Sequence, residues 1–202
     1  MQLRLISYIR FIYRKHLYIG YIYLCNFLIN DKIMSNYILL GGFFMVTECS
    51  LKKVKDDAEK LFQSGGFYCS ESIVASIRMN LAPEMPESLI MAASGFPVGV
   101  GRSKCMCGAV SGGVLCLGYF FGRMAPSNPQ DPKSVNTLKL ANELQQSFRD
   151  NHKGVLCCHV HTRGMDMASG EHKAQCVSFT GEMAMKTAEI IVRELNITNT
   201  DI

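Results

Sequence analysis

Nine cysteines are the residues of this 202-residue chain whose types and spacing could support chemistry. Their thiolates can act as nucleophiles and as metal ligands. The odd number and the adjacent pair Cys157-Cys158 do not fit the disulfide framework of a secreted domain. Clustered thiols in a reducing cytosol indicate redox chemistry or metal binding, so we expect a cytoplasmic protein. The candidates for this chemistry are Cys69, Cys105, Cys107, Cys157, Cys158 and Cys176.

The segment Gly99–Gly113 places two of these cysteines at the start of a predicted helix. Its glycine-rich loop can turn sharply, since glycine adopts backbone conformations that other residues resist. Cys107 comes directly before an apolar stretch, and the unpaired amides and dipole of a helix start favour a thiolate there. Arg102 and Lys104 either lower the thiol pKa further or are simply solvated. We predict that Cys107 is the most reactive thiol, unless these cysteines only pack as small hydrophobic residues.

Two further candidates lie on other predicted helices. Cys69 follows a glycine turn at the entry to a helix, where a thiolate is again favoured. Cys176 falls on the inner face of the last predicted helix. One of Cys69, Cys158 and Cys176 is expected to resolve the mixed disulfide that forms at the reactive thiol. His159 or His161 would donate or accept the proton, unless both are solvated surface residues.

Hydrophobic periodicity predicts the helices that must bring these cysteines together. Apolar residues recur at helical spacing, and glycine or proline separates each segment from the next. The segments expected to be helical are residues 51–62, 69–81, 86–94, 108–121, 132–148 and 170–191. Neither an internal repeat nor an alternating strand pattern is visible. The predicted fold is therefore all-α, a single helical-bundle domain of about five to six helices, with Cys116 packed in its core.

Residues 1–44 form a hydrophobic and basic appendage to the predicted helical, cysteine-rich redox domain of residues 45–202. They hold five Lys or Arg and one acidic residue, which leaves 16 of each in the rest of the chain. A neutral body argues against nucleic acid as a partner. The apolar run Leu17–Ile29 is shorter than the ~20 residues of a membrane-spanning helix. We favour a true translation start at Met45 or Met34, with a peripheral membrane anchor as the alternative, so membrane contact is expected only through this appendage.

The order of the cysteines resembles that of the C-GCAxxG-C-C family of small bacterial redox-active proteins. The first cysteine stands in Gly66-Phe67-Tyr68-Cys69, and the glycine-alanine core is Cys107-Gly108-Ala109-Val110-Ser111-Gly112. Cys158 and Cys176 then follow, where Cys158 is preferred over Cys157 as the third family cysteine. The similarity covers about residues 47–195. It implies a redox role but fixes no substrate.

The first hypothesis is thiol–disulfide exchange or electron transfer with a redox partner protein or a small thiol or disulfide. Whether the protein is an enzyme, a thiol–disulfide oxidoreductase, stays open. The chain has no Cys-x-x-Cys, which argues against a thioredoxin-type site. Cys105 instead makes a Cys-x-Cys pair with Cys107, which could form a strained, easily reduced disulfide or bind a soft metal.

The alternative is a four-cysteine binding module for an iron–sulfur cluster or zinc, because both centres accept four thiolates. The separations along the chain match no standard ferredoxin or zinc finger, although a helical bundle can gather distant ligands. Several other side chains would extend the site to copper(I), or else are packing and solvated residues: His159, His161, His172, Met106, Met165 and Met167. A third hypothesis holds that the cysteines are only structural and the protein is an interaction partner.

Overall fold

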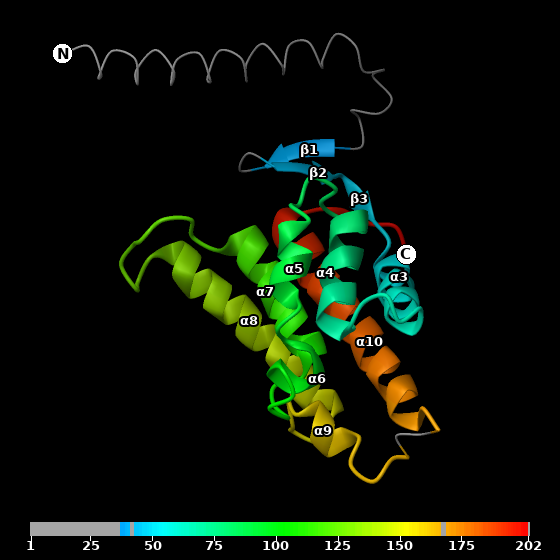
Figure 1. Ribbon diagram of the computed structural model, residues 1–202. Coiled ribbons are helices and arrows are strands. Elements are labelled where there is room, and N and C mark those ends of the chain that lie inside the picture. Colours follow the sequence, from blue (N-terminus) through cyan, green and yellow to red (C-terminus); the bar gives the residue numbers. More distant parts are fainter. Residues whose placement is uncertain (1–36, 41–42, 167–168, 202) are drawn as a thin grey trace, which may run out of the picture. The chain divides into compact units, whose positions relative to one another are not determined.

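The computed structural model describes residues 37–40, 43–166 and 169–201 (Figure 1). Within this part the chain is mostly helical, which confirms the predicted all-α fold. Ile38–Ile202 forms one compact unit. Its helices are α3 (Leu51–Gln63), α4 (Cys69–Asn80), α5 (Ser88–Ala93), α6 (Pro97–Val100), α7 (Gly108–Phe121), α8 (Pro132–Asn151), α9 (Cys158–His161) and α10 (Glu171–Leu195). The strands are β1 (Tyr37–Leu40), β2 (Phe43–Val46), β3 (Glu48–Cys49) and β4 (Thr198–Asn199).

Three helices, α4, α7 and α10, pack on one another at the centre of the bundle (Figure 1). Helix α3 covers α4 and α10, and α8 packs on α7 and α10. The core is apolar, and the predicted core residue Cys116 is fully buried. Burial of this surface is the main favourable term in folding. The helices α6 and α9 contact each other at one end of the bundle, beside the start of α7.

Two glycines of the central helix α7, Gly112 and Gly113, stand where the neighbouring helices leave no room for a side chain. A Cβ atom on Gly112 would lie 2.8 Å from the Cα of Ser70 in α4. A Cβ atom on Gly113 would collide with the Thr187 hydroxyl of α10. Glycine in a helix interior costs roughly 1 kcal/mol relative to alanine, and here the close packing of backbones offsets that cost.

Two short strands, one before α3 and one after α10, pair with each other. The sequence pattern does not predict these strands. Strands β3 and β4 pair in parallel, with Glu48 opposite Thr198. Ser50 caps α3, and its hydroxyl also donates to the Asp201 carboxylate, 2.6 Å away. Two-residue strands are too short to show the alternation by which strands are recognised. Strands β1 and β2 pair with each other in a second small sheet.

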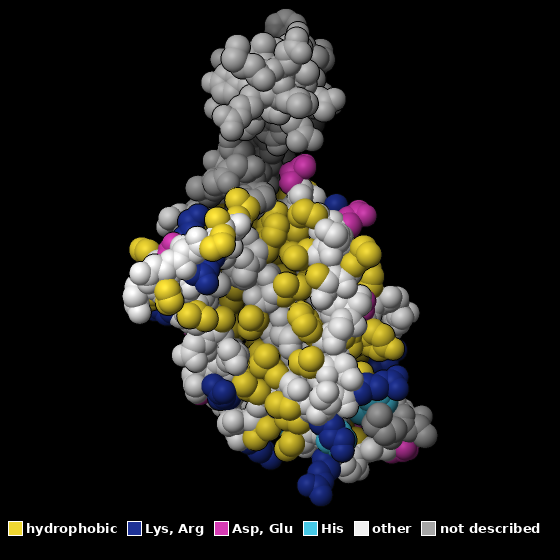
Figure 2. All heavy atoms as spheres, turned by 60° about the vertical axis from the view of Figure 1, so that its left-hand side comes forward, with side chains coloured by type: hydrophobic (Ala, Val, Ile, Leu, Met, Phe, Trp, Pro, Cys, Tyr) yellow, Lys and Arg dark blue, Asp and Glu magenta, His cyan; other side chains and the backbone are white. Residues whose placement is uncertain are grey.

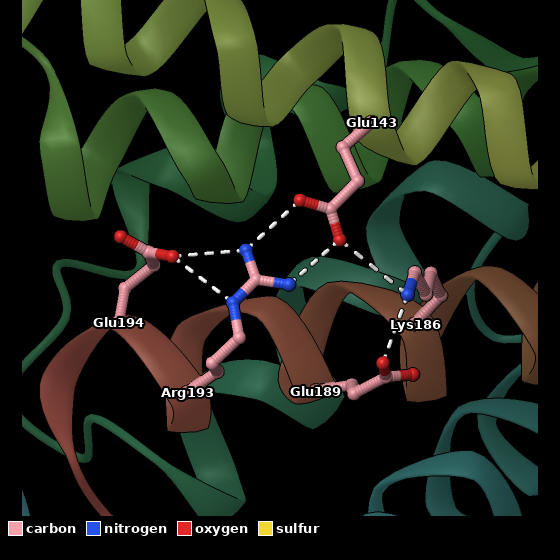
Figure 3. A network of polar contacts seen from close by, with 5 residues as sticks. All are labelled: Glu143, Lys186, Glu189, Arg193 and Glu194. Carbon is pink, nitrogen blue, oxygen red and sulfur yellow. Dashed lines mark hydrogen bonds and ion pairs between the residues drawn. The ribbon is translucent and has the colours of Figure 1, made fainter.

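A network of ion pairs fastens α8 to α10 (Figure 3). The Arg193 guanidinium donates to both carboxylate oxygens of Glu143, at 2.8 and 2.9 Å. Lys186 lies between Glu143 and Glu189, with its Nζ 3.5 and 2.8 Å from their oxygens. Such a two-pronged contact fixes orientation as well as adding energy.

The predictions about the N-terminal appendage fall mainly on residues 1–36, which lie outside the described residues. Position 44, where the appendage was expected to end, is inside β2. The predicted start at Met45 or Met34 and the peripheral anchor stay predictions. In the part of the chain that the structure describes, no helix combines the length and apolarity needed to cross a bilayer.

Candidate functional site

The first turn of α7 brings distant cysteines together. Cys107 is the N-cap of α7, the position predicted for it. Its backbone N–H donates to the carbonyl oxygen of Leu156 at 2.9 Å. This contact holds the segment before α9 against the start of α7, so that Cys158, the first residue of α9, lies beside Cys107.

Cys107 and Cys158 form a buried pair of hydrogen-bonded thiol groups, exposed by only 3% and 8%. The hydrogen bond from Cys107 is the largest cause that lowers the pKa of Cys158 to about 7. The backbone N–H groups of Cys158, His159 and Gly108 also donate to this sulfur. The same hydrogen bond, together with burial, raises the pKa of the Cys107 thiol well above its usual value. Near neutral pH the thiolate of the pair is therefore favoured at Cys158, while Cys107 stays protonated.

Cys69 places a third sulfur against the same helix start. It opens α4, and a Cβ atom on Gly108 would lie 2.6 Å from its Sγ. The backbone N–H groups of Ser70 and Val98 donate to this sulfur. Burial, the largest cause, together with the nearby Cys176 and Cys158 nevertheless raises the pKa of Cys69 to about 12.

Cys176 adds the fourth sulfur from α10. Burial, the larger cause, and the neighbouring Cys158 together raise its pKa to about 11. Cys69 also interacts electrostatically with Cys107 and with Cys176. The four sulfurs come from α4, α9, α10 and the N-cap of α7, and each interacts with at least one of the others. The structure therefore places Cys69, Cys107, Cys158 and Cys176 in one region, and their shared role as site residues stays a prediction.

The two secondary candidates form a second pair, at the surface. Cys105 is exposed and Cys157 is half-buried, and their side chains are hydrogen-bonded to each other. The Cys157 thiol also donates to the carbonyl oxygen of Lys104. The sequence suggested Cys107 as the partner of Cys105, whereas the structure pairs Cys105 with Cys157. All eight described cysteines are free thiols.

The pKa values reverse the expected order of reactivity. Cys107 and Cys69 do lie at helix starts, but burial and neighbouring sulfurs outweigh the helix amides at both positions. The favoured thiolate is Cys158, which receives the Gly108 N–H from the start of α7 as well as the Cys107 thiol. A sequence cannot show this, because the donor and acceptor are fifty positions apart and meet only through the fold.

The loop before α7 is wound tightly enough to require its glycines. Gly99 has a φ of 66°, and a Cβ atom there would lie 2.6 Å from the carbonyl carbon of Lys104. Arg102 and Lys104 themselves have φ values of 71° and 77°, which residues other than glycine rarely adopt. Such strained backbone persists where the surrounding contacts over-determine it, and it is concentrated at functional sites.

A comparison with family models supplies an independent finding. Residues 67–190 match the family described as "Putative redox-active protein (C_GCAxxG_C_C)". The chain belongs to this C-GCAxxG-C-C family. The match spans the four converging cysteines, which confirms the resemblance noted in the sequence. Neither the curated proteins nor the solved structures gave a match.

The histidines of this C-GCAxxG-C-C protein lie in different surroundings. The His161 ring contacts the rings of Phe148 and Phe179, and its Nε2 is 2.9 Å from the carbonyl oxygen of Val155. The His159 side chain is exposed, and its contribution to the pair is its backbone N–H. The Nδ1 atom of His172 is buried and has no hydrogen-bond partner among the residues that the structure describes. The proton-transfer role expected of His159 or His161 stays a prediction.

The metal-binding prediction finds no ready-made ligand set. Within residues 37–40, 43–166 and 169–201, no group of three or more His, Cys, Asp or Glu side chains is arranged to hold a metal ion. Met167, one of the residues suggested for copper(I), lies outside the described residues. The family description names redox activity and no metal.

An apolar groove of about 570 Å³ opens beside the loop that carries Cys105. Met106, between Cys105 and Cys107, is part of its wall, and α5 and α7 provide most of the remainder. Figure 2 shows that hydrophobic side chains also gather along one face of the molecule, while Lys, Arg and His side chains gather at its lower end. The residues lining the groove are Leu89, Phe96, Val100, Met106, Ser111, Val114, Leu115, Gly118 and Tyr119.

Proposed function

We propose that this protein carries out thiol–disulfide exchange at the pair Cys107 and Cys158. The observation that carries the proposal is that two buried cysteines from distant segments lie side by side, where the Cys107 N–H donates to the Leu156 carbonyl oxygen at 2.9 Å. In this pair the Cys158 sulfur ionises near pH 7, whereas the Cys107 sulfur stays protonated. A dithiol can then use one sulfur as the nucleophile and the other as the proton donor. An attacking thiol works best when its pKa is close to the ambient pH.

The exchange runs in two balanced steps. The Cys158 thiolate attacks one sulfur of a substrate disulfide, forms a mixed disulfide, and expels the other substrate sulfur as a thiolate. That leaving thiolate takes up the proton of Cys107. The Cys107 sulfur then attacks Cys158 Sγ and expels the second substrate sulfur, which takes a proton from water. Two electrons have moved to the substrate, and Cys107 and Cys158 are joined by a disulfide.

Cys69 and Cys176 have a different place in this proposal. Their pKa values of about 12 and 11 keep both sulfurs protonated at neutral pH. A protonated thiol is a poor nucleophile. The Cys107 thiol is protonated as well, but the largest cause that raises its pKa is its hydrogen bond to Cys158, which ends once Cys158 is part of the mixed disulfide, whereas burial continues to act on Cys69 and Cys176. We therefore expect Cys107 and Cys158 to form the first disulfide upon oxidation, while Cys69 and Cys176 remain reduced.

Disulfide mapping after mild oxidation tests the proposal. The protein is purified without oxygen, treated with glutathione disulfide, alkylated and digested, and linked peptides are identified by mass spectrometry. The proposal expects a linkage of Cys107 to Cys158, absent in Cys158→Ser and unchanged in the control Cys116→Ala, whose sulfur lies in the core away from the pairs. A first disulfide between Cys69 and Cys176 would overturn it.

Metal analysis of the same preparation addresses the alternative, a four-cysteine metal or iron–sulfur module. The convergence of four sulfurs is the feature that favours this alternative. A colourless protein with titratable thiols supports exchange. Iron with inorganic sulfide, or zinc near one per chain, would overturn it in favour of a cluster or a zinc site held by Cys69, Cys107, Cys158 and Cys176.

A further inference from the structure

The surface pair, Cys105 and Cys157, lies outside the cysteines that define the family motif. The two side chains are hydrogen-bonded, although 52 positions separate them in the sequence. Cys105 is exposed, whereas the buried pair, Cys107 and Cys158, is exposed by only 3% and 8%. A disulfide on another protein can therefore reach Cys105 far more readily than either sulfur of the buried pair.

Both pairs are built from the same two segments, which run side by side. Cys105 and Cys107 come from the loop before α7, and Cys157 and Cys158 come from the start of α9. Two contacts hold the segments together: the Cys107 N–H to Leu156, and the Cys157 thiol to the Lys104 carbonyl. This arrangement sets each sulfur of one segment opposite a sulfur of the other.

The surface pair and the buried pair are also close to each other. The sulfur of Cys105 interacts electrostatically with that of Cys158 as well as with that of Cys157. We propose that Cys105 and Cys157 form a relay that carries disulfide bonds between external disulfides or dithiols and the buried pair. This inference rests on the proposed exchange at Cys107 and Cys158. It adds the route by which an external disulfide or dithiol oxidises or reduces that pair.

Inside the protein, the disulfide bond passes from the surface pair to the buried pair. An external disulfide first oxidises the surface pair to a Cys105–Cys157 disulfide. The Cys158 thiolate attacks Cys105 Sγ, forms a Cys105–Cys158 bond, and expels Cys157 as a thiolate, which takes the proton of Cys107. The Cys107 sulfur attacks Cys158 Sγ and expels Cys105, which is protonated by water. Two electrons have passed from the buried pair to the surface pair, and the reverse sequence reduces the buried pair.

The rate at which the buried disulfide forms tests the relay. Reduced wild-type protein and the double variant Cys105→Ser/Cys157→Ser are mixed with glutathione disulfide, quenched by acid, alkylated and digested with trypsin. Cleavage after Lys104, Arg123, Lys153 and Arg163 leaves both pairs within the same two peptides, so fragmentation spectra assign the linkage in wild type. The relay predicts that the buried linkage forms at least ten-fold more slowly in the double variant. The equilibrium between the Cys107–Cys158 disulfide and the glutathione couple should be the same in both proteins. If Cys105 and Cys157 had a merely structural role, their replacement would change this equilibrium.

A trapping variant tests whether the two pairs reach each other. In Cys107→Ser/Cys157→Ser the second transfer step is blocked, so glutathione disulfide should produce a Cys105–Cys158 linkage. The same treatment of Cys116→Ala serves as the matched control. Failure of that linkage, or buried-pair oxidation within two-fold of wild type in Cys105→Ser/Cys157→Ser, overturns the relay and leaves the exchange intact. If wild type never links Cys107 to Cys158, the exchange itself is wrong.

Discussion

Replacing Cys107 with alanine should raise the pKa of the Cys158 thiol. The variant removes the thiol that donates to Cys158, which is the largest of the causes that hold this pKa near 7 instead of 9.0. Burial, which opposes the thiolate, remains, and so do the backbone donors. Cys107→Ser keeps a donating hydroxyl in the same place and is the matched control. It should retain most of the lowered pKa.

The size of the effect on reactivity follows from two opposing factors. If the pKa returns to 9.0, the thiolate fraction of Cys158 at pH 7 falls from about one half to about 1%, a roughly 50-fold loss. A more basic thiolate is a better nucleophile, and a Brønsted slope of about 0.4–0.5 returns about 6–10-fold. The net prediction for a complete return is an alkylation rate about 5–8-fold below wild type at pH 7. Above about pH 8 the variant should react faster than wild type.

The assay is the rate at which iodoacetamide labels Cys158, followed by peptide mass spectrometry between pH 5.5 and 10. Since Cys157 lies in the same peptide, all proteins carry Cys157→Ser. Thiolate absorbance at 240 nm, measured as the difference from Cys158→Ser, reports ionisation without requiring reagent access. If Cys158 still titrates near pH 7 in Cys107→Ala, the hydrogen bond is not the cause of the lowered pKa and our reasoning fails.

Two further predictions concern stability. Gly112→Ala should destabilise the fold by about 1–3 kcal/mol, because its Cβ would press on the Ser70 backbone. Gly118→Ala, in the same helix with open space around it, should instead stabilise by up to about 1 kcal/mol; urea unfolding compares the two, and equal effects would contradict the packing argument. Glu143→Gln should cost at most about 1 kcal/mol at pH 7. Arg193 lowers the pKa of Glu143, so this cost should be present above the usual carboxyl pKa of 4.5 and vanish as the pH falls below the lowered value. A urea midpoint difference that does not shrink as the pH is lowered below 4.5 would contradict this.

The longer helices could be predicted because residues at or next to their ends mark where they begin and end. Gly65-Gly66 ends the first described helix, and Asp131 with Pro132 begins α8, where the Asp131 carboxylate accepts the backbone N–H of Lys133. The short helix α9 could not be predicted, because four residues do not establish a period. The parallel pairing of β3 with β4 depends on the two ends of the domain meeting, which no local pattern records.

The positions of the candidate cysteines on the helices could be predicted from the sequence, whereas the order of their pKa values could not. The helix-start positions of Cys69 and Cys107 are visible in the sequence, and both are found there. Burial and partner choice decide which sulfur ionises, and both depend on which segments pack together. The contact between Leu156 and Cys107 sets the register of the two segments, and with it the pairing of Cys105 with Cys157 instead of Cys107.

Gly108, the glycine directly after Cys107 in the family motif, contacts two of the cysteine sulfurs. Its N–H donates to the Cys158 sulfur, and the space that a side chain would occupy is filled by the Cys69 sulfur, the Phe96 carbonyl oxygen and the Pro97 Cα. A residue with a Cβ would keep the donor but push Cys69 away from the pair. Glycine directly after Cys107 therefore leaves room for the Cys69 sulfur beside the helix start whose N–H groups donate to the Cys107 and Cys158 sulfurs.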